Sequence, residues 1–180
     1  MKRQFFTWAN QFTLLRLGLI PFFAVAVVEG HYVWALSLLV VAGVSDALDG
    51  LLARWLKQRT ALGAYLDPIT DKLLLSTAFV VLAVRGDIPW TLSVLVLGRD
   101  VLMVVVAGVI VVAAGFRPFP PSIYGKGCTA VQMLTVLAVV LGRVWPPAEV
   151  LWPVLLWLTA ALTVLTGVHY AYQTGKVMPR

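Results

Sequence analysis

The chain has 180 residues, of which 61% are hydrophobic and only 12% are charged, and its mean hydropathy is +0.91. Soluble domains are about 45–50% apolar and about 25% charged. This composition excludes a water-soluble globular protein and predicts an integral membrane protein with a single domain over residues 1–180. The net charge of +6 suits anionic lipid headgroups or phosphate-bearing substrates. Nucleic acid is a poor partner because the basic residues lie in loops between apolar segments.

Six apolar segments are long enough for the about 20 residues that a bilayer requires. They lie near residues 12–29, 32–53, 63–84, 90–114, 126–143 and 149–172. The sequence lacks the strand-type alternation of a membrane barrel, so we expect an all-α bundle of about six transmembrane helices. Before the first segment, MKRQFFTWAN combines cations with aromatic residues and is expected to form a short helix along the membrane interface.

The basic residues are distributed unevenly between the two sides of these segments. Arg85 and Arg143 fall on one side. The other side receives Lys2, Arg3, Arg54, Lys57, Arg59, Arg117, Lys126, Lys176 and Arg180. Because cytoplasmic loops carry the excess of Lys and Arg, we expect both termini on the cytoplasmic side of a bacterial inner or plasma membrane.

Four aspartates occur where the second apolar segment ends and the third begins. Asp46 and Asp49 are three residues apart and Asp67 and Asp71 are four apart, so each pair shares one face of a helix. A carboxylate at bilayer depth costs at least a few kcal/mol unless something compensates it. The two helices are consecutive and antiparallel, so we expect the two faces to converge at the cytoplasmic end. Two divalent cations would cancel the four charges, and an all-oxygen ligand set favours Mg²⁺ or Mn²⁺.

Neighbours of these aspartates suit a phosphate-bearing ligand. Gly50 and Gly63 allow a ligand to approach the backbone, and Arg54 can fork onto a phosphate. Singly, each also has a structural explanation in helix packing or in the placement of positive charge. A cation-coupled transporter is the competing interpretation, because carboxylates within the membrane also mark cation paths. Against a transporter, the acids cluster at one end and the sequence shows no inverted repeat.

The spacing of these residues matches a known signature. The sequence follows Asp-x-x-Asp-Gly-x-x-Ala-Arg, eight residues, then Gly-x-x-x-Asp-x-x-x-Asp, from Asp46 to Asp71. This pattern resembles the signature of the CDP-alcohol phosphotransferase family, and every fixed position is filled. The resemblance implies the fold of that family, transfer of the phosphatidyl group of CDP-diacylglycerol to an alcohol, release of CMP, and a homodimer.

The resemblance also implies roles for individual residues. Asp46, Asp49 and Asp67 would be the main ligands of two divalent cations, with Asp71 near the second metal. Asp71 would also be the general base that takes the proton of the acceptor hydroxyl. The CDP pocket would be lined by Asp49, Gly50, Arg54 and Gly63.

The sequences around the motif narrow the acceptor to a glycerol type. LGAYLDPITDK and NQFTLLR resemble the branch that contains phosphatidylglycerophosphate synthases and eukaryotic-type cardiolipin synthases. GFRPFPPSIYGKGCTAVQ is slightly closer to cardiolipin synthase-like members, yet glycerol 3-phosphate and phosphatidylglycerol both stay open as acceptors. Either acceptor carries a phosphate, which a cationic patch would bind. The candidates for that patch are Arg16, Arg99, Arg117 and Lys126, and Asp100 is the expected partner of Arg99.

Overall fold

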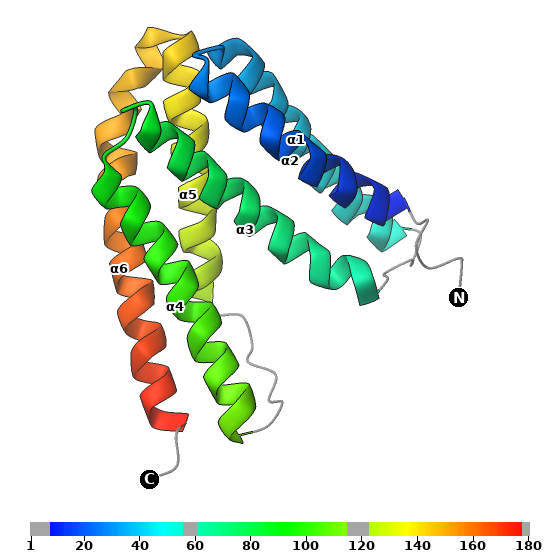
Figure 1. The fold of residues 1–180 in the computed structure, drawn as a ribbon, viewed down its shortest axis with the longest axis vertical. Coiled ribbons are helices and arrows are strands. Elements are labelled where there is room, and N and C mark those ends of the chain that lie inside the picture. The colour runs from blue at the N-terminus through cyan, green and yellow to red at the C-terminus, as the bar shows by residue number, and fades with distance from the viewer. Residues whose placement is uncertain (1–7, 56–60, 115–122, 178–180) are drawn as a thin grey trace.

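The structure is a computed structural model and describes residues 8–55, 61–114 and 123–177. The described residues form six long helices and one short 3₁₀ helix (Figure 1): α1 (Trp8–Val28), α2 (Tyr32–Trp55), α3 (Ala61–Val84), α4 (Trp90–Ala114), α5 (Ile123–Val144), η2 (Pro146–Leu151) and α6 (Trp152–Val177). No strand occurs among these residues, which confirms the all-α prediction. Residues 1–7, which make up most of the predicted interfacial helix, lie outside the described residues, and Trp8 already belongs to α1.

Two short connections reverse the chain through glycines with a left-handed backbone. Gly30 has a φ of 79° after α1, and Gly86 has a φ of 77° after α3. At the end of α1, the amide of Gly30 donates to Val27 O at 3.0 Å and that of His31 donates to Ala26 O at 2.8 Å. Gly86 and its successor repeat the pattern at the end of α3. These are Schellman caps, which satisfy the last carbonyls of a helix and favour glycine because it has no Cβ.

The helices converge at one end of the molecule and splay apart toward the other (Figure 1). The converging end consists of the connections 29–31 and 85–89 together with η2. α1 packs against α2 and α3, whereas α6 packs against α4 and α5, and α3 and α5 connect the two groups. Fully buried side chains such as Phe23, Phe79 and Val139 fill the space between these helices. The splayed end holds the first residues of α1 and the last residues of α6.

A buried polar seam joins α5 to α6. The hydroxyls of Thr135 and Thr159 lie 2.7 Å apart, and Gln132 Nε2 donates to Thr163 Oγ1 at 3.4 Å. Cys128 is buried beside Thr163, with its sulfur 3.7 Å from the hydroxyl. Hydrogen bonds of this kind hold helices together where the surroundings are apolar, so they fix the register of α5 against α6.

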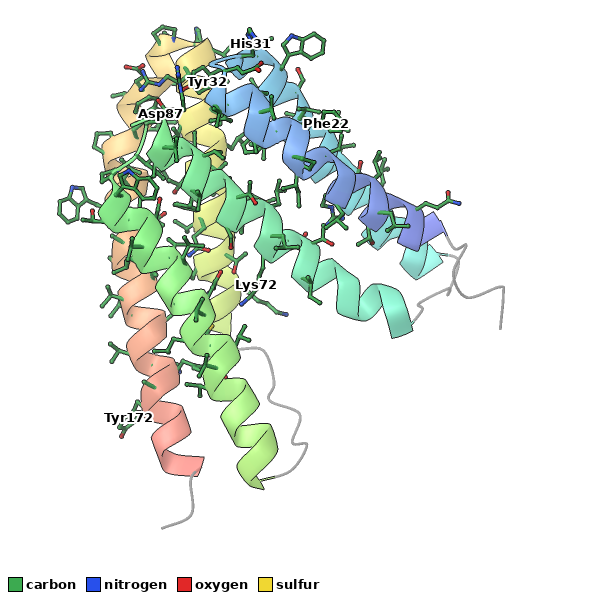
Figure 2. The ribbon with its side chains drawn as sticks, in the orientation of Figure 1. Phe22, His31, Tyr32, Lys72, Asp87 and Tyr172 are labelled. Atoms are coloured by element: carbon green, nitrogen blue, oxygen red, sulfur yellow. The ribbon has the colours of Figure 1, made fainter. Side chains whose placement is uncertain are left out.

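Large apolar side chains cover the outside of the molecule. Trp157 is 78% exposed and Phe22 is 67% exposed. Figure 2 shows Phe22 on the outside of α1. Soluble monomers rarely expose a contiguous surface of this kind, whereas a lipid environment favours it. Among the described residues, two stretches are long and apolar enough to cross a membrane, Gly125–Val144 and Pro146–Tyr172.

Two shorter apolar stretches, Thr13–Val28 and Tyr32–Ser45, also occur within the part of the chain that the structure describes. α2 carries the charged motif residues Asp46, Asp49 and Arg54 in its C-terminal half. In the same way α3 carries adjacent charges at Asp71 and Lys72. Charged residues therefore interrupt the apolar sequence within α2 and α3.

One carboxylate ties the converging end together. Asp87 has a side chain only 3% exposed, and it accepts a hydrogen bond from Tyr32 Oη at 2.5 Å (Figure 2). Arg143 also contacts it, through Nε at 2.8 Å and Nη2 at 2.6 Å. The Arg143 guanidinium lies 4.9 Å from the ring centre of Trp152, at the start of α6. The Asp87 cluster, defined as these four residues, therefore links α2, α5 and α6 to the connection after α3.

Replacing Asp87 should loosen this end of the molecule. Asp87→Asn keeps an acceptor for Tyr32 but removes the charge that Arg143 contacts, so we expect the free energy of unfolding to fall by about 1–3 kcal/mol. Thermal unfolding of the purified protein in detergent measures this. Glu29→Gln is the matched control, because the contact of Glu29 with His31, at 3.7 Å, is exposed on both sides and should contribute little. Equal melting temperatures for the two variants would contradict the role of Asp87.

Candidate active site

The four motif aspartates lie on two helices. Asp46 and Asp49 occupy the C-terminal half of α2, and Asp67 and Asp71 the N-terminal half of α3. Both segments are helical at these positions, so each pair shares one helix face as the spacing predicts. Among these aspartates the structure describes the side chain of Asp71. The other predicted metal and CDP-binding residues have side chains outside the described part: Asp46, Asp49, Gly50, Arg54, Gly63 and Asp67.

α1 lies against both helices that carry the motif. Over the described residues, α1 packs against α2 and against α3, while α2 and α3 do not pack against each other (Figure 1). Over these residues α2 and α3 are therefore not direct neighbours, and the expected convergence of their motif faces falls on side chains outside the described part. The physical reason is that the apolar faces of both helices are buried against α1, through residues such as Phe23 and Val27. A side chain of α1 consequently belongs to the surroundings of the motif.

Arg16 is that side chain. It lies on α1 and is only 1% exposed, and its Nη1 forms an ion pair with Asp71 Oδ1. Burial of a guanidinium is expensive unless a carboxylate compensates it, so the pair explains how α1 tolerates a charge at this depth. The Asp71 side chain remains 41% exposed, so a ligand can still reach the carboxylate. Arg16 was expected in the acceptor patch, and the structure places it beside the predicted base.

A second group of charges lies on α3 and α4. Arg99 Nη1 donates to Asp100 Oδ1 at 2.7 Å, which confirms the predicted partner of Arg99. Lys72 Nζ lies 3.7 Å from the same oxygen and reaches it from α3 (Figure 2). The Arg99 side chain is 6% exposed, and within the described part of the chain its Nε has no hydrogen-bond partner. Arg99 therefore retains a buried donor beyond the one that Asp100 uses.

A small cavity of about 240 Å³ opens beside Lys72 and Asp100. Its other walls are apolar side chains and one hydroxyl: Ser76, Leu97, Val101, Val104 and Val105. Lys72 was not predicted as a site residue. Its position next to Asp71 in the sequence could have indicated it. Adjacent residues on a helix point in different directions, so they can contact two different neighbouring helices. Here Asp71 contacts α1 and Lys72 contacts α4.

The remaining acceptor candidates are not brought to this group by the described contacts. Lys126 is exposed near the start of α5. Arg117 lies outside the described residues. Of the four predicted acceptor-site cations, Arg16 therefore contacts the motif residue Asp71 directly. Arg99 contacts Asp100, and the same carboxylate contacts Lys72, the neighbour of Asp71 in the sequence.

The residues fit a divalent cation in their chemistry. Hard cations such as Mg²⁺ and Mn²⁺ prefer carboxylate oxygens, and Asp71 offers a partly exposed carboxylate on the same helix face as Asp67. Among the described side chains, no three His, Cys, Asp or Glu residues come together as a metal site. The side chains of three of the four predicted metal ligands, Asp46, Asp49 and Asp67, are not among those described.

Comparison with known proteins agrees with the motif. The sequence profile of the CDP-alcohol phosphatidyltransferase family matches residues 6–165. The chain belongs to this family. Since the match includes α1 to α5 and about half of α6, family membership covers the whole bundle and not only the motif.

Similar proteins fall into two groups by name. The chain is 31% identical to a cardiolipin synthase (CMP-forming) of Homo sapiens, over 94% of this chain and 62% of that protein. It is 39% identical to a "probable phosphatidylglycerophosphate synthase" of Mycobacterium tuberculosis, over 90% of this chain and 78% of that protein. A cardiolipin synthase (CMP-forming) of Rattus norvegicus is 30% identical, again over 62% of its length. The chain thus spans about three fifths of the mammalian relatives.

Proposed function

We propose that this protein transfers the phosphatidyl group of CDP-diacylglycerol to a glycerol-type alcohol and releases CMP. The observation that carries the proposal is the complete motif from Asp46 to Asp71, placed on α2 and α3 of a chain that belongs to the family. The names of the similar proteins support the proposal, since cardiolipin synthase and phosphatidylglycerophosphate synthase are both names of glycerophospholipid synthases. Family membership disfavours the cation-coupled transporter.

The same proposal includes a membrane topology. The chain acts as one catalytic domain with six membrane-crossing helices, a cytoplasmic active site and cytoplasmic termini, in a bacterial inner or plasma membrane. The support is the exposed apolar surface of the described residues and the excess of Lys and Arg on one side of the apolar segments in the sequence. Family resemblance further supports a homodimer.

Binding of CDP-diacylglycerol is assigned to the motif. Asp46, Asp49 and Asp67 would hold two divalent cations, Mg²⁺ or Mn²⁺, with Asp71 near the second. When bound, these cations would neutralise the charge that builds on the pyrophosphate. The CDP pocket is assigned to Asp49, Gly50, Arg54 and Gly63. The glycines would let the nucleotide approach the backbone, and Arg54 would donate to a phosphate oxygen.

The reaction is a displacement at the phosphorus that bears the lipid. The acceptor hydroxyl oxygen forms the new bond to phosphorus, the bond from phosphorus to the CMP oxygen breaks, and the hydroxyl proton passes to the Asp71 carboxylate. A base must lie within hydrogen-bond reach of the proton it takes, and the exposed part of Asp71 allows that approach. Arg16 keeps this carboxylate on the side of α3 that faces α1.

The acceptor patch is centred on Arg99. Its buried guanidinium keeps a donor beyond the contact with Asp100, and Lys72 lies on the other side of that carboxylate. A phosphate group is the ligand that such a fork binds best. Arg16, Arg117 and Lys126 are further candidates. Glycerol 3-phosphate and phosphatidylglycerol both bring the required phosphate.

Release of CMP tests the function directly. The purified protein in lipid nanodiscs receives CDP-diacylglycerol and Mg²⁺ or Mn²⁺, with glycerol 3-phosphate or phosphatidylglycerol in parallel reactions. We expect CMP release that depends on one of the two acceptors and stops with a metal chelator. No release with either acceptor and either metal would contradict the proposed function.

Asp71→Asn should nearly abolish turnover while CDP-diacylglycerol binding stays largely intact. The amide cannot take the proton, so kcat should fall by about 10²–10⁴-fold. The kcat and the dissociation constant of the nucleotide lipid are measured on the same preparation. Asp87→Asn is the matched control, because it makes the same change at the converging end and should leave kcat within about twofold below its melting temperature. Near-normal turnover of Asp71→Asn would show that another group is the base.

Arg99→Gln should weaken the acceptor selectively. Loss of a charge-assisted hydrogen bond to phosphate corresponds to about 10–100-fold, so the KM of the phosphate-bearing acceptor should rise by that factor. The KM of CDP-diacylglycerol should change little. Arg85→Gln, at an exposed arginine of the converging end, serves as the control. An equal rise in both KM values would assign Arg99 to general stability rather than to the acceptor.

A further inference from the structure

A groove runs between the first turns of α4 and the first half of α6, two helices that lie side by side (Figure 1). This α4–α6 groove has a volume of about 570 Å³, within the about 300–1,000 Å³ that ligand pockets occupy. Its walls are mainly apolar: Leu92, Leu95, Trp152, Leu156, Trp157 and Ala160. Trp157 is also among the most exposed side chains, so the groove opens to the surroundings of the bundle. None of the motif residues on α2 and α3 lines it.

Trp152 gives the groove a fixed wall. Its indole Nε1 donates to Ala138 O at 2.9 Å. The ring lies so close to α5 that a Cβ placed on Gly142 would be 2.5 Å from Nε1, so only glycine fits there. On the other side, the Arg143 guanidinium lies 4.9 Å from the ring centre. Because the protein itself holds this wall in place, a ligand does not have to order it, which lowers the cost of binding.

Opposite charges flank the groove. Glu149 lines it from η2 with an exposed side chain, and across the ranges that the structure describes its carboxylate forms no ion pair. Arg143 contacts Asp87 through Nε and Nη2, yet its side chain is still 37% exposed beside Trp152. A carboxylate attracts an ammonium, and an accessible guanidinium attracts a phosphate. The two charges together therefore suit a zwitterionic ligand with an apolar tail.

We propose that the α4–α6 groove binds a membrane phospholipid whose headgroup carries both a phosphate and a primary ammonium, such as phosphatidylethanolamine. One acyl chain lies between α4 and α6, the ammonium pairs with Glu149, and the phosphate approaches Arg143. Tryptophans are enriched at the depth of lipid headgroups, which agrees with Trp152 and Trp157 beside these charges.

The bound lipid connects two elements that the chain leaves apart. Over the described residues η2 packs against α5 and α6 but not against α4. Both η2 and α4 nevertheless line the groove, through Glu149 and Leu92. A lipid in the groove therefore contacts both elements at once and stabilises the converging end.

Native mass spectrometry of the full-length protein in detergent counts bound lipids and tests the headgroup contact. The protein is titrated with phosphatidylethanolamine and, separately, with phosphatidylglycerol of the same acyl chains. Glu149→Gln should weaken binding of phosphatidylethanolamine about fivefold, the factor expected for one exposed ion pair, and leave phosphatidylglycerol binding unchanged. Glu29→Gln removes an exposed acid elsewhere at the same end and is the matched control, with no effect on either lipid.

Two results of this titration would overturn the proposal. In one, the affinity of Glu149→Gln for phosphatidylethanolamine stays within twofold of that of the unmodified protein. In the other, both lipids weaken equally, which would mean that Glu149 supports the fold and does not contact the ammonium.

A bulky side chain in the groove tests the place of the acyl chain. Ala160→Phe puts a ring between α4 and α6 and should weaken phosphatidylethanolamine binding about tenfold. Ala161→Phe is the matched control, because Ala161 is the exposed neighbour of Ala160 and does not line the groove. If Ala160→Phe does not fold, Thr91→Trp blocks the groove from an exposed position on α4. Unchanged lipid binding by a folded blocking variant would overturn the proposal.

A second copy of the chain is the competing occupant of the groove. The same spectra report the oligomeric state. Loss of lipid by the blocking variant with an unchanged oligomeric state supports the lipid site. Loss of the oligomer with unchanged lipid binding would make the groove an interface between copies and overturn the proposal. The groove lies apart from the motif, so absence of CMP release would reject the transferase and leave the lipid site standing.

Discussion

Buried charge must be compensated across helices, and this requirement organises the described part of the bundle. Arg16 of α1 meets Asp71 of α3, Lys72 of α3 meets Asp100 of α4, and Arg143 of α5 meets Asp87 after α3. Each pair crosses between elements that are distant in sequence. Because an unpaired charge at such depth is costly, each pair also specifies which helices can be neighbours. α3 takes part in or adjoins all three contacts, which is consistent with its position between the two groups of helices in Figure 1.

The two ends of the molecule use this requirement differently. At the converging end the carboxylate of Asp87 is almost fully covered and accepts from a tyrosine and an arginine. Its hydrogen-bonding capacity is used internally, so it stabilises the connections. Toward the splayed end Asp71 has a buried partner but remains partly exposed. A carboxylate held on one side and open on the other is suited to chemistry, whereas one enclosed on all sides is suited to holding loops together. The converging end can then keep α1 to α3 in place while the Asp71 carboxylate stays accessible toward the splayed end.

Much of this architecture could be predicted from sequence. The apolar runs predicted the long helices to within a few residues at most ends, because helix length in a membrane is set by bilayer thickness and the connecting residues interrupt the runs clearly. The pairing of Arg99 with Asp100 was predictable because the two are adjacent. The contact of Arg16 with Asp71 was not, because it depends on the way α1 packs against α3. Over the described residues α2 does not pack directly on α3, and chain order could not reveal this, because it gives only antiparallel direction while both helices bury apolar side chains against α1.

α1 therefore contributes more than a membrane anchor, although it carries none of the motif residues. Its apolar face packs against α2 and α3, and its one buried cation contacts the carboxylate assigned to proton transfer. Any change in the packing of α1 moves that cation relative to Asp71, so the reactivity of the motif is coupled to helix packing some distance along the chain. An arginine fixed beside Asp71 therefore sets the surroundings of that carboxylate from a helix outside the motif.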